Sequence, residues 1–428
     1  MTVAITLALL LALLAIGIPV AFTLAIAGAA GLLVTGGPTL LHGILESAPL
    51  STLDSFEFIT IPMFILMAQL LTISGIADNL FDAAAVWLGR TKGGLAIATA
   101  ITGAAFGAIS GSSTASAATL SSTSIPAMMQ QGYERKFASG VVAISGTLAM
   151  LIPPSIAIVF YGLLSGASIA KLLVAGVMPG LVVTLAIILT VKYLVFREPA
   201  LAPSKQSYTW TQKIESLKVI GPFAVIFTFV TGSIYLGIAT PVEASVLGAF
   251  SSLVYAMILR RLTLKNFYEA AVSTARTTAM IALVLICAQI FSYFLTLTQS
   301  TQALIQLVGD SGLDSWLILL IIIVIYLALG CLLDLISTLI LTVPVVLPII
   351  VALGYDPIWF GIVVIVTAEV GMVTPPVGLN VFVVSKYTGI PVTDVFRGVG
   401  PHFIAHLAVI ALLCFFPGIV MWLPELMG

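Results

Sequence analysis

Two short segments rich in hydroxyl groups and two pairs of adjacent prolines carry the groups of this chain that could bind ions. The hydroxyl-rich segments are Ser110–Thr114 and Asp334–Thr338, and the prolines are Pro153-Pro154 and Pro375-Pro376. Adjacent prolines interrupt a helix, because proline has no N–H and restricts the residue before it. The freed carbonyls and the nearby hydroxyls suit a dehydrated Na⁺, and the N-termini of half-helices suit a carboxylate.

The composition places these groups in a lipid bilayer. The chain has 428 residues, of which 60% are hydrophobic and only 8% charged, whereas a soluble domain has about 25% charged residues. Apolar runs recur at lengths near the roughly 20 residues that a spanning helix needs. We therefore expect an all-α polytopic membrane protein. The net charge of −1 gives no basic footprint for nucleic acid.

An internal repeat relates the two sets of segments. Residues 126–154 align without a gap to residues 348–376, at an offset of 222 positions, and eight of the 29 aligned positions are identical. Under this offset Ser112 corresponds to Asp334, and the two proline pairs correspond to each other. Internal duplication of this kind is typical of secondary transporters.

The loops of the two copies differ in charge. Cytoplasmic loops are enriched in Lys and Arg. The loops of the first copy contain Arg90, Lys92, Arg135 and Lys136, whereas the matching loops of the second copy contain Asp310, Asp314 and Asp356 and no basic residue. We therefore predict that the two copies are inverted across the membrane.

Each copy is predicted to contain a re-entrant helical hairpin followed by a broken helix. The apolar arms on either side of Ser110–Thr114 are about 24 Å long at 1.5 Å per residue, which is short for two full crossings of ~30 Å of hydrocarbon. Irregular backbone at membrane depth needs protein or a water-filled cavity around it. The predicted arms are 94–109 and 115–129 in the first copy and 316–330 and 339–351 in the second, and the broken helices are interrupted at the proline pairs.

Four sequence motifs of this chain resemble those of a known family. The motifs Gly107–Ser113, Ile152–Ser155, Gly330–Asp334 and Thr374–Asn380 are similar to those of the large membrane subunit of tripartite ATP-independent periplasmic (TRAP) transporters, and the resemblance runs over nearly the whole chain. It implies an elevator-type fold of the ion-transporter superfamily in the bacterial inner membrane. A transport domain, built from the hairpins and broken helices, would carry substrate and Na⁺ past a fixed scaffold.

The resemblance also implies a substrate, a coupling ion and partners. The substrate would be an organic carboxylate such as a C4-dicarboxylate or a sialic acid, the coupling ion would be Na⁺, and no organic cofactor or enzymatic activity is expected. One partner would be a small four-helix membrane subunit on a separate chain, because this sequence starts directly with the large-subunit pattern. The other would be a periplasmic substrate-binding protein.

Motif by motif, the resemblance implies two sets of Na⁺ ligands and one set of substrate contacts. One Na⁺ site would use Ser110, Ser113, Gly146 and Pro153. The other would use Gly330, Asp334, Ser337, Thr374 and Gly378. The substrate contacts would be Ser112, Ser113, Asp334 and Asn380.

Asp334 is the most informative single residue, because a carboxylate at membrane depth costs roughly 2.5–3.5 kcal/mol. It could contact a cation or a polar substrate group, or it could cap the helix that begins at Leu335, and the sequence leaves both roles open. For Glu369 a structural hydrogen bond is favoured over a substrate contact. His402 and His406 are favoured as packing residues, because a zinc site would need two more ligands nearby.

The expected organisation alternates scaffold and transport segments. Residues 1–75 form N-terminal scaffold helices with an interfacial helix, 76–168 the first repeat, 169–297 scaffold helices with a cytoplasmic loop at 196–218, 298–390 the second repeat, and 391–428 a C-terminal scaffold helix. The alternative is a stand-alone divalent-anion/Na⁺ symporter-type carrier of the same superfamily. Its hairpin tips usually read Ser-Asn-Thr, where this chain has Ser112-Ser113-Thr114 and Ile336-Ser337-Thr338.

Overall fold

The computed structural model describes residues 2–203 and 208–427. The described residues form helices joined by short loops and no strand, and nine helical stretches are long and apolar enough to cross a membrane. The prediction of an all-helical protein with many membrane spans is therefore confirmed. Residues 204–207, which belong to the expected cytoplasmic loop 196–218, lie outside the described residues.

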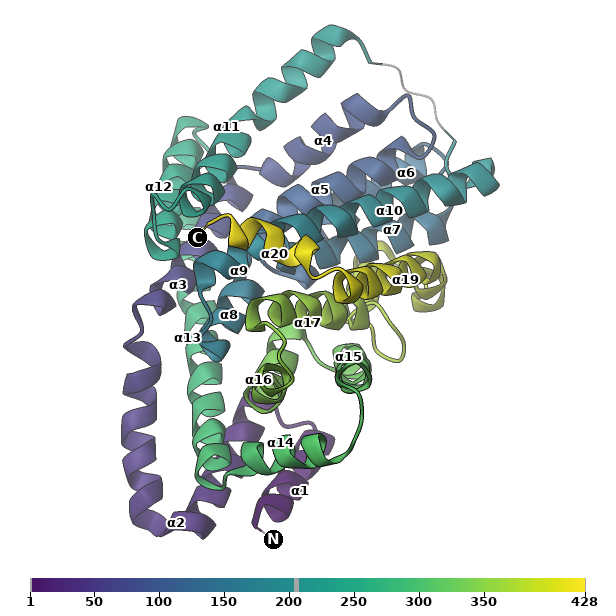
Figure 1. Ribbon diagram of the computed structural model, residues 1–428. Helices are drawn as coiled ribbons and strands as arrows, with labels where there is room; N and C mark the ends of the chain where they lie inside the picture. The colour runs from purple at the N-terminus through teal and green to yellow at the C-terminus, as the bar shows by residue number, and fades with distance from the viewer. Residues whose placement is uncertain (1, 204–207, 428) are drawn as a thin grey trace.

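One group of helices is arranged around two long elements, α2 and α13 (Figure 1). α2 bends at Gly37, which has a φ of 76° and precedes Pro38. α2 also packs closely on α13. Gly28 of α2 has no side chain, so the backbone of Phe291 in α13 can lie directly against it. The helices of this group are α1 (Thr2–Ala15), α2 (Val20–Leu53), η1 (Phe56–Ile59), α3 (Thr60–Ile73), α11 (Trp210–Tyr235), α12 (Pro241–Ile258) and α13 (Leu264–Leu297).

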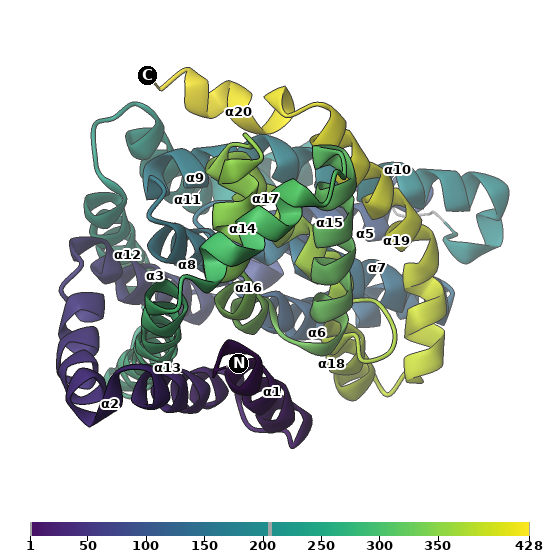
Figure 2. The same cartoon turned by 60° about the horizontal axis from the view of Figure 1, so that its bottom comes forward.

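The repeat seen in the sequence recurs in the helix boundaries. The first copy comprises α4 (Ile76–Leu88), α5 (Gly94–Ser110), α6 (Ser113–Gln130), α7 (Arg135–Thr147), η2 (Leu148–Met150) and α8 (Ile156–Ser165). The second comprises α14 (Ser300–Asp310), α15 (Ser315–Leu332), α16 (Leu335–Ala352), α17 (Pro357–Gly371) and α18 (Leu379–Thr388). Both ends of α6 coincide with both ends of α16 under the offset of 222 positions. Figure 2 shows α14 crossing in front of the second hairpin.

The tips of both hairpins are shorter than the sequence predicted. Only Gly111 and Ser112 separate α5 from α6, and only Leu333 and Asp334 separate α15 from α16. Gly111 adopts a left-handed conformation with φ 56° that ends α5, and glycine does so at little steric cost. The predicted tip residues Ser113, Thr114 and 335–338 are therefore already helical, because capping at the preceding residue starts each second arm at once.

Both broken helices are interrupted where the sequence predicted. η2 continues α7 and ends at Met150, and α8 begins at Ile156. α17 ends at Gly371, and α18 begins at Leu379. Each gap contains its proline pair, joined by a cis peptide bond.

The remaining helices pack on the two repeats. They are α9 (Ile169–Ala175), α10 (Val177–Arg197), η3 (Pro199–Leu201), α19 (Val392–Phe415) and α20 (Gly418–Glu425). α10 packs against α5 and α19, and α19 packs against α7 and α17 (Figure 1). The expected organisation placed α10 and α19 in the scaffold, and that assignment stays a prediction.

Candidate functional site

The second arm of each hairpin packs against the second half of the broken helix from the other repeat. α6 contacts α18, and α16 contacts α8. The two copies are therefore interlocked. A site at their junction takes residues from both halves of the sequence.

Ser113 and Asn380 form the direct polar contact at one of these junctions. The Ser113 hydroxyl donates to Asn380 Oδ1 at 2.9 Å, and both side chains are fully buried. Ser113 is the first residue of α6 and Asn380 the second residue of α18, so the N-termini of two helices converge here. Each N-terminus carries roughly +0.5 elementary charge, and the pair therefore favours a bound anion. The Nδ2 of Asn380 has no hydrogen-bond partner in the described part of the chain.

Ser112 and Asp334 are both helix N-caps. Ser112 Oγ accepts from the N–H of Ala115 at 3.4 Å, and Asp334 Oδ2 accepts from the N–H of Ser337 at 3.4 Å. The Asp334 side chain is exposed on the surface of the described chain. Of the two roles that the sequence left open, the structure shows capping. Contact with a cation or substrate stays a prediction.

The hydroxyls of two other predicted ligands are engaged locally. Ser110 Oγ lies 2.6 Å from Ser116 Oγ, which ties the end of α5 to the first turn of α6. Thr374 Oγ1 donates to the carbonyl of Val370 at 2.6 Å, at the end of α17. An ion that bound either oxygen would have to use its remaining lone pair.

The predicted glycine ligands lie where helices approach closely. A Cβ atom at Gly146 would lie 2.9 Å from the Cβ of Ala117 in α6, and one at Gly330 would lie 2.4 Å from the carbonyl oxygen of Ala368 in α17. These contacts hold the first hairpin on α7 and the second on α17. Gly378 has φ 62° and lies against the ring of Phe396. Pro153 is buried.

The sequence predicted freed backbone carbonyls at the breaks but did not identify which residues carry them. Because Pro154 and Pro376 have no N–H, the carbonyls of Met150 and Met372 lose their helical donors. The Ser155 hydroxyl donates to Met150 O at 2.5 Å, and the N–H of Asn380 donates to Met372 O at 3.2 Å. Met150 and Met372 are aligned in the repeat and are the same residue type, and this match is the sequence signal that could have paired their carbonyls.

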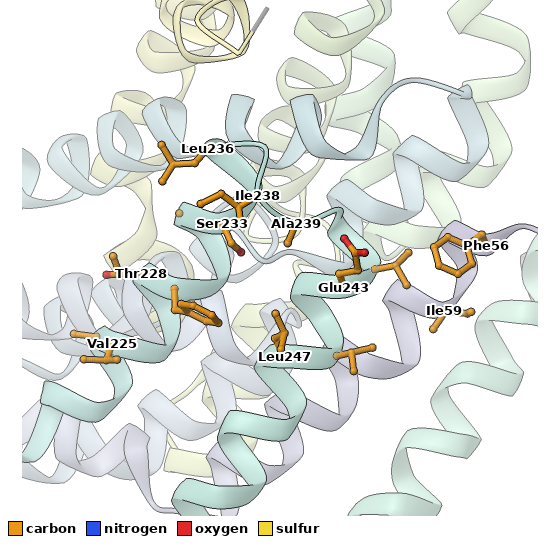
Figure 3. Close-up of a pocket in the computed structure, with 15 residues that line it drawn as sticks. Phe56, Ile59, Val225, Thr228, Ser233, Leu236, Ile238, Ala239, Glu243 and Leu247 are labelled. Atoms are coloured by element: carbon orange, nitrogen blue, oxygen red, sulfur yellow. The ribbon is translucent and has the colours of Figure 1, made fainter.

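A pocket lies away from this junction, between α11 and α12. It has a volume of about 1170 Å³, and Figure 3 shows its lining, which includes Phe56, Val225, Leu236 and Leu247. Only three lining residues have polar side chains: Thr228, Ser233 and Glu243. The Glu243 carboxylate already accepts from the N–H of Thr240 at 2.8 Å. This apolar groove lacks the convergent donors that an organic anion needs.

The remaining titratable candidates are buried. His402 and His406 lie inside α19, where His406 Nδ1 is 2.8 Å from the carbonyl of His402. The described residues contain no group of three or more His, Cys, Asp or Glu side chains arranged to hold a metal ion.

Comparison with known proteins places this architecture in a family. The family model described as "Tripartite ATP-independent periplasmic transporter, DctM component" matches residues 7–419. The chain belongs to this family. It is therefore a multi-pass membrane component of a bacterial TRAP transporter and not an enzyme, and the tripartite system implies a small permease subunit and a periplasmic binding protein as partners.

Individual relatives of this DctM-family protein cover most of its length. It is 32% identical to the C4-dicarboxylate TRAP transporter large permease protein DctM of Pseudomonas aeruginosa, over 88% of each chain. It is 30% identical to the sialic acid TRAP transporter large permease protein SiaM of Vibrio cholerae, over 97% of each chain. It is also 32% identical to the isethionate TRAP transporter permease protein DctMQ of Oleidesulfovibrio alaskensis, over 96% of this chain and 64% of that protein.

A solved structure shares the fold. The crystal structure of the YdaH transporter of Alcanivorax borkumensis superimposes with a TM-score of 0.66, and the match covers 90% of each chain at 14% sequence identity. At this identity the match shows the fold alone.

Proposed function

We propose that this DctM-family protein mediates Na⁺-coupled uptake of an organic carboxylate that a periplasmic binding protein delivers, by an elevator mechanism in the inner membrane. The observation that carries the proposal is the Ser113–Asn380 junction, where the N-termini of α6 and α18 meet. The substrate carboxylate would bind there, with Asn380 Nδ2 as a donor and with Ser112 and Ser113 beside it. Asp334 would contact a polar group of the substrate or a cation. A C4-dicarboxylate and a sialic acid are the leading candidates.

We propose two sets of oxygen ligands for Na⁺, and their chemistry fits a hard monovalent cation. The first proposed site combines the hydroxyls of Ser110 and Ser113 with backbone oxygens near Gly146 and Pro153. The second combines the tip at Gly330, Asp334 and Ser337 with Thr374 and Gly378. Bound Na⁺ would add positive charge next to the carboxylate. The residues of this chain would hold the hairpin tips and the helix breaks in the geometry that binds Na⁺ and the substrate carboxylate.

The elevator mechanism is supported by the character of one contact between the first repeat and the scaffold helices. Met67 of α3 and Phe223 and Val230 of α11 lie beside Ile109 and Pro154 around one small cavity. These facing side chains are apolar. The two salt bridges seen in the described residues are both within single helices, so neither ties the two parts together. An apolar, non-directional contact permits sliding without breaking ion pairs.

The inverted repeat supplies two related conformations for such a movement. Equivalent helices in the two copies would exchange environments when the transport unit moves, as is typical of transporters with inverted repeats. Because α10 and α19 pack on α5, α7 and α17, we propose that both helices move with this unit.

Uptake into proteoliposomes tests the function directly. The purified protein is reconstituted with its small subunit, and radiolabelled candidate acids are supplied with or without the binding protein, under an inward Na⁺ gradient or an equal K⁺ gradient. We expect uptake only when the binding protein, the small subunit and the Na⁺ gradient are all present. Robust uptake by this chain alone would favour the stand-alone symporter-type carrier, and equal uptake in K⁺ would remove Na⁺ coupling.

A further inference from the structure

Two tryptophans and a lysine form a cluster that the functions above do not use. Trp87 is in the last turn of α4, Trp210 is the first residue of α11, and Lys213 follows in the first turn of α11. The two indole rings meet edge to face, with their centroids 6.3 Å apart. The Lys213 ammonium lies 5.4 Å from the centroid of the Trp87 ring and 5.0 Å from that of the Trp210 ring. One cation is therefore within cation–π distance of two rings.

The cluster joins two parts of the fold that are far apart in the sequence. α4 is the first helix of the first repeat, and α11 belongs to the helices grouped around α2 and α13. The two helices pack against each other (Figure 1). Trp87 comes from α4, whereas Trp210 and Lys213 come from α11. A ligand of this cluster would therefore contact both parts at once.

The cluster lies where a membrane-spanning helix begins. Residues 210–235 form one of the helical stretches long and apolar enough to cross a membrane, and Trp210 is its first residue. Both indole rings reach the surface, with 41% of Trp87 and 71% of Trp210 exposed. Tryptophan is enriched at the membrane–water interfaces, where its ring sits at the level of the lipid headgroups. We therefore expect the cluster at headgroup level.

The charge of Lys213 has no carboxylate partner. Neither of the two salt bridges among the described residues includes it. Glu215 is two positions further along the same helix, and residues at that spacing do not face each other. Asp82 precedes Trp87 by more than one turn of α4. The faces of the two rings attract the ammonium but accept no ordinary hydrogen bond, so its three N–H donors still suit an anionic oxygen.

Further cations occur beside the cluster. Arg90 and Lys92 are exposed in the loop directly after α4, and Lys218 is exposed on α11. Basic residues next to a membrane surface attract anionic phospholipids. Indole N–H groups are additional hydrogen-bond donors. The charge and the donors gathered here are therefore complementary to a lipid phosphate.

We propose that Trp87, Trp210 and Lys213 bind the headgroup of an anionic phospholipid. The Lys213 ammonium donates to the phosphate oxygens, and the two rings hold the ammonium in place while their apolar surfaces contact the lipid below its headgroup. A single lipid would thereby connect α4 of the first repeat to α11. The inference depends on neither the substrate nor the coupling ion proposed above.

Lipid titration of the purified full-length protein, followed by native mass spectrometry, tests the site. Dimyristoylphosphatidylglycerol is the anionic probe, and dimyristoylphosphatidylcholine, which has the same acyl chains and no net charge, is the reference. The measured quantity is the ratio of the apparent dissociation constants of the two lipids. In Lys213→Gln we expect the preference for the anionic lipid to fall about fivefold, which corresponds to ~1 kcal/mol. Lys213→Arg keeps a cation that stacks on aromatic rings and should keep the preference.

Lys218→Gln is the matched control, because it removes an exposed cation from the same helix and leaves the cluster intact. It should lower the preference much less than Lys213→Gln does. Trp87→Leu and Trp210→Leu remove one ring each and leave the charge. Each should lower the preference about twofold, because the ammonium is then held less firmly.

Several results would overturn the site. An unchanged preference in Lys213→Gln would show that this cation does not bind the headgroup, and equal losses in Lys213→Gln and Lys218→Gln would show only a diffuse attraction. If Lys213→Gln does not fold, the two tryptophan variants decide, and a wild-type preference in both refutes the proposal. Inorganic phosphate should not displace the bound lipid, because it has no acyl chains. Displacement by an equal concentration of phosphate would show a site for the free anion and would refute the lipid as its ligand.

Discussion

The hydroxyl of Ser113 lies 2.9 Å from Oδ1 of Asn380, although 267 positions separate the two residues in the chain. Each residue stands at the start of a helix that follows an interruption, one at a hairpin tip and the other after a proline pair. The bond therefore joins the first repeat to the second at the point where two helix N-termini converge. This convergence is the feature on which the proposed anion site depends.

The Ser113–Asn380 bond should be measurable in a double-mutant cycle. Ser113→Ala leaves the amide of Asn380 buried without its donor, which we expect to lower the free energy of unfolding by about 1–3 kcal/mol. Asn380→Ala should cost a similar amount, and the double variant should cost less than the sum of the two, because the bond is lost only once. Chemical denaturation in detergent gives the three values. Strictly additive losses would show that the two side chains act independently.

Asp334 can be tested by exchanging it for its repeat counterpart. Asp334→Ala removes the N-cap of α16, and we expect a loss of about 0.5–2 kcal/mol in stability together with loss of uptake in a protein that still inserts and purifies. Asp334→Ser keeps a capping oxygen, as Ser112 does in the first repeat, and should recover the melting temperature.

Uptake by the Asp334→Ser variant then separates the two roles of Asp334. Full uptake would show that the cap suffices, whereas stability without uptake would show that the charge binds an ion or the substrate. Wild-type transport rates in Asp334→Ala would remove Asp334 from the site.

Gly330 should tolerate no side chain. A Cβ there would lie 2.4 Å from the carbonyl oxygen of Ala368, so Gly330→Ala must separate α15 from α17. We expect a destabilisation of about 1–3 kcal/mol from overpacking, seen as a lower melting temperature and less uptake. Gly309 of α14 is the matched control, because nothing lies within 4 Å of a Cβ there. Gly309→Ala should leave stability unchanged or raise it, and an equal loss in both variants would contradict the close approach.

If the repeats are inverted as predicted, two equivalent loop residues should be labelled from opposite sides of the membrane. Lys92 and Asp314 correspond under the offset of 222 positions, and both are exposed. In a background without the three native cysteines, Lys92→Cys should react with a membrane-impermeant maleimide only after the cytoplasm is opened. Asp314→Cys should react in intact spheroplasts. Labelling of both residues from the same side would show that the copies are parallel.

Much of the local structure was predictable from the sequence, because it depends on neighbouring residues. Glycine and a capping residue fixed the end of α5 and the start of α6, and the proline pairs interrupted both broken helices where expected. The predicted hairpin tips were too long, because Ser113 and Ser337 were predicted to have irregular backbone. Both residues lie in the first turn of a capped helix.

The sequence by itself determined that this chain is a helical membrane protein built from two related copies, because hydropathy, proline chemistry and internal similarity are local properties of the chain. Only the tertiary structure decided which elements of the two copies meet. The pairing of α6 with α18 and the bond between Ser113 and Asn380 both join segments more than two hundred positions apart. Such contacts depend on how apolar helices of similar composition pack against one another, and no local pattern in the sequence distinguishes one packing partner from another.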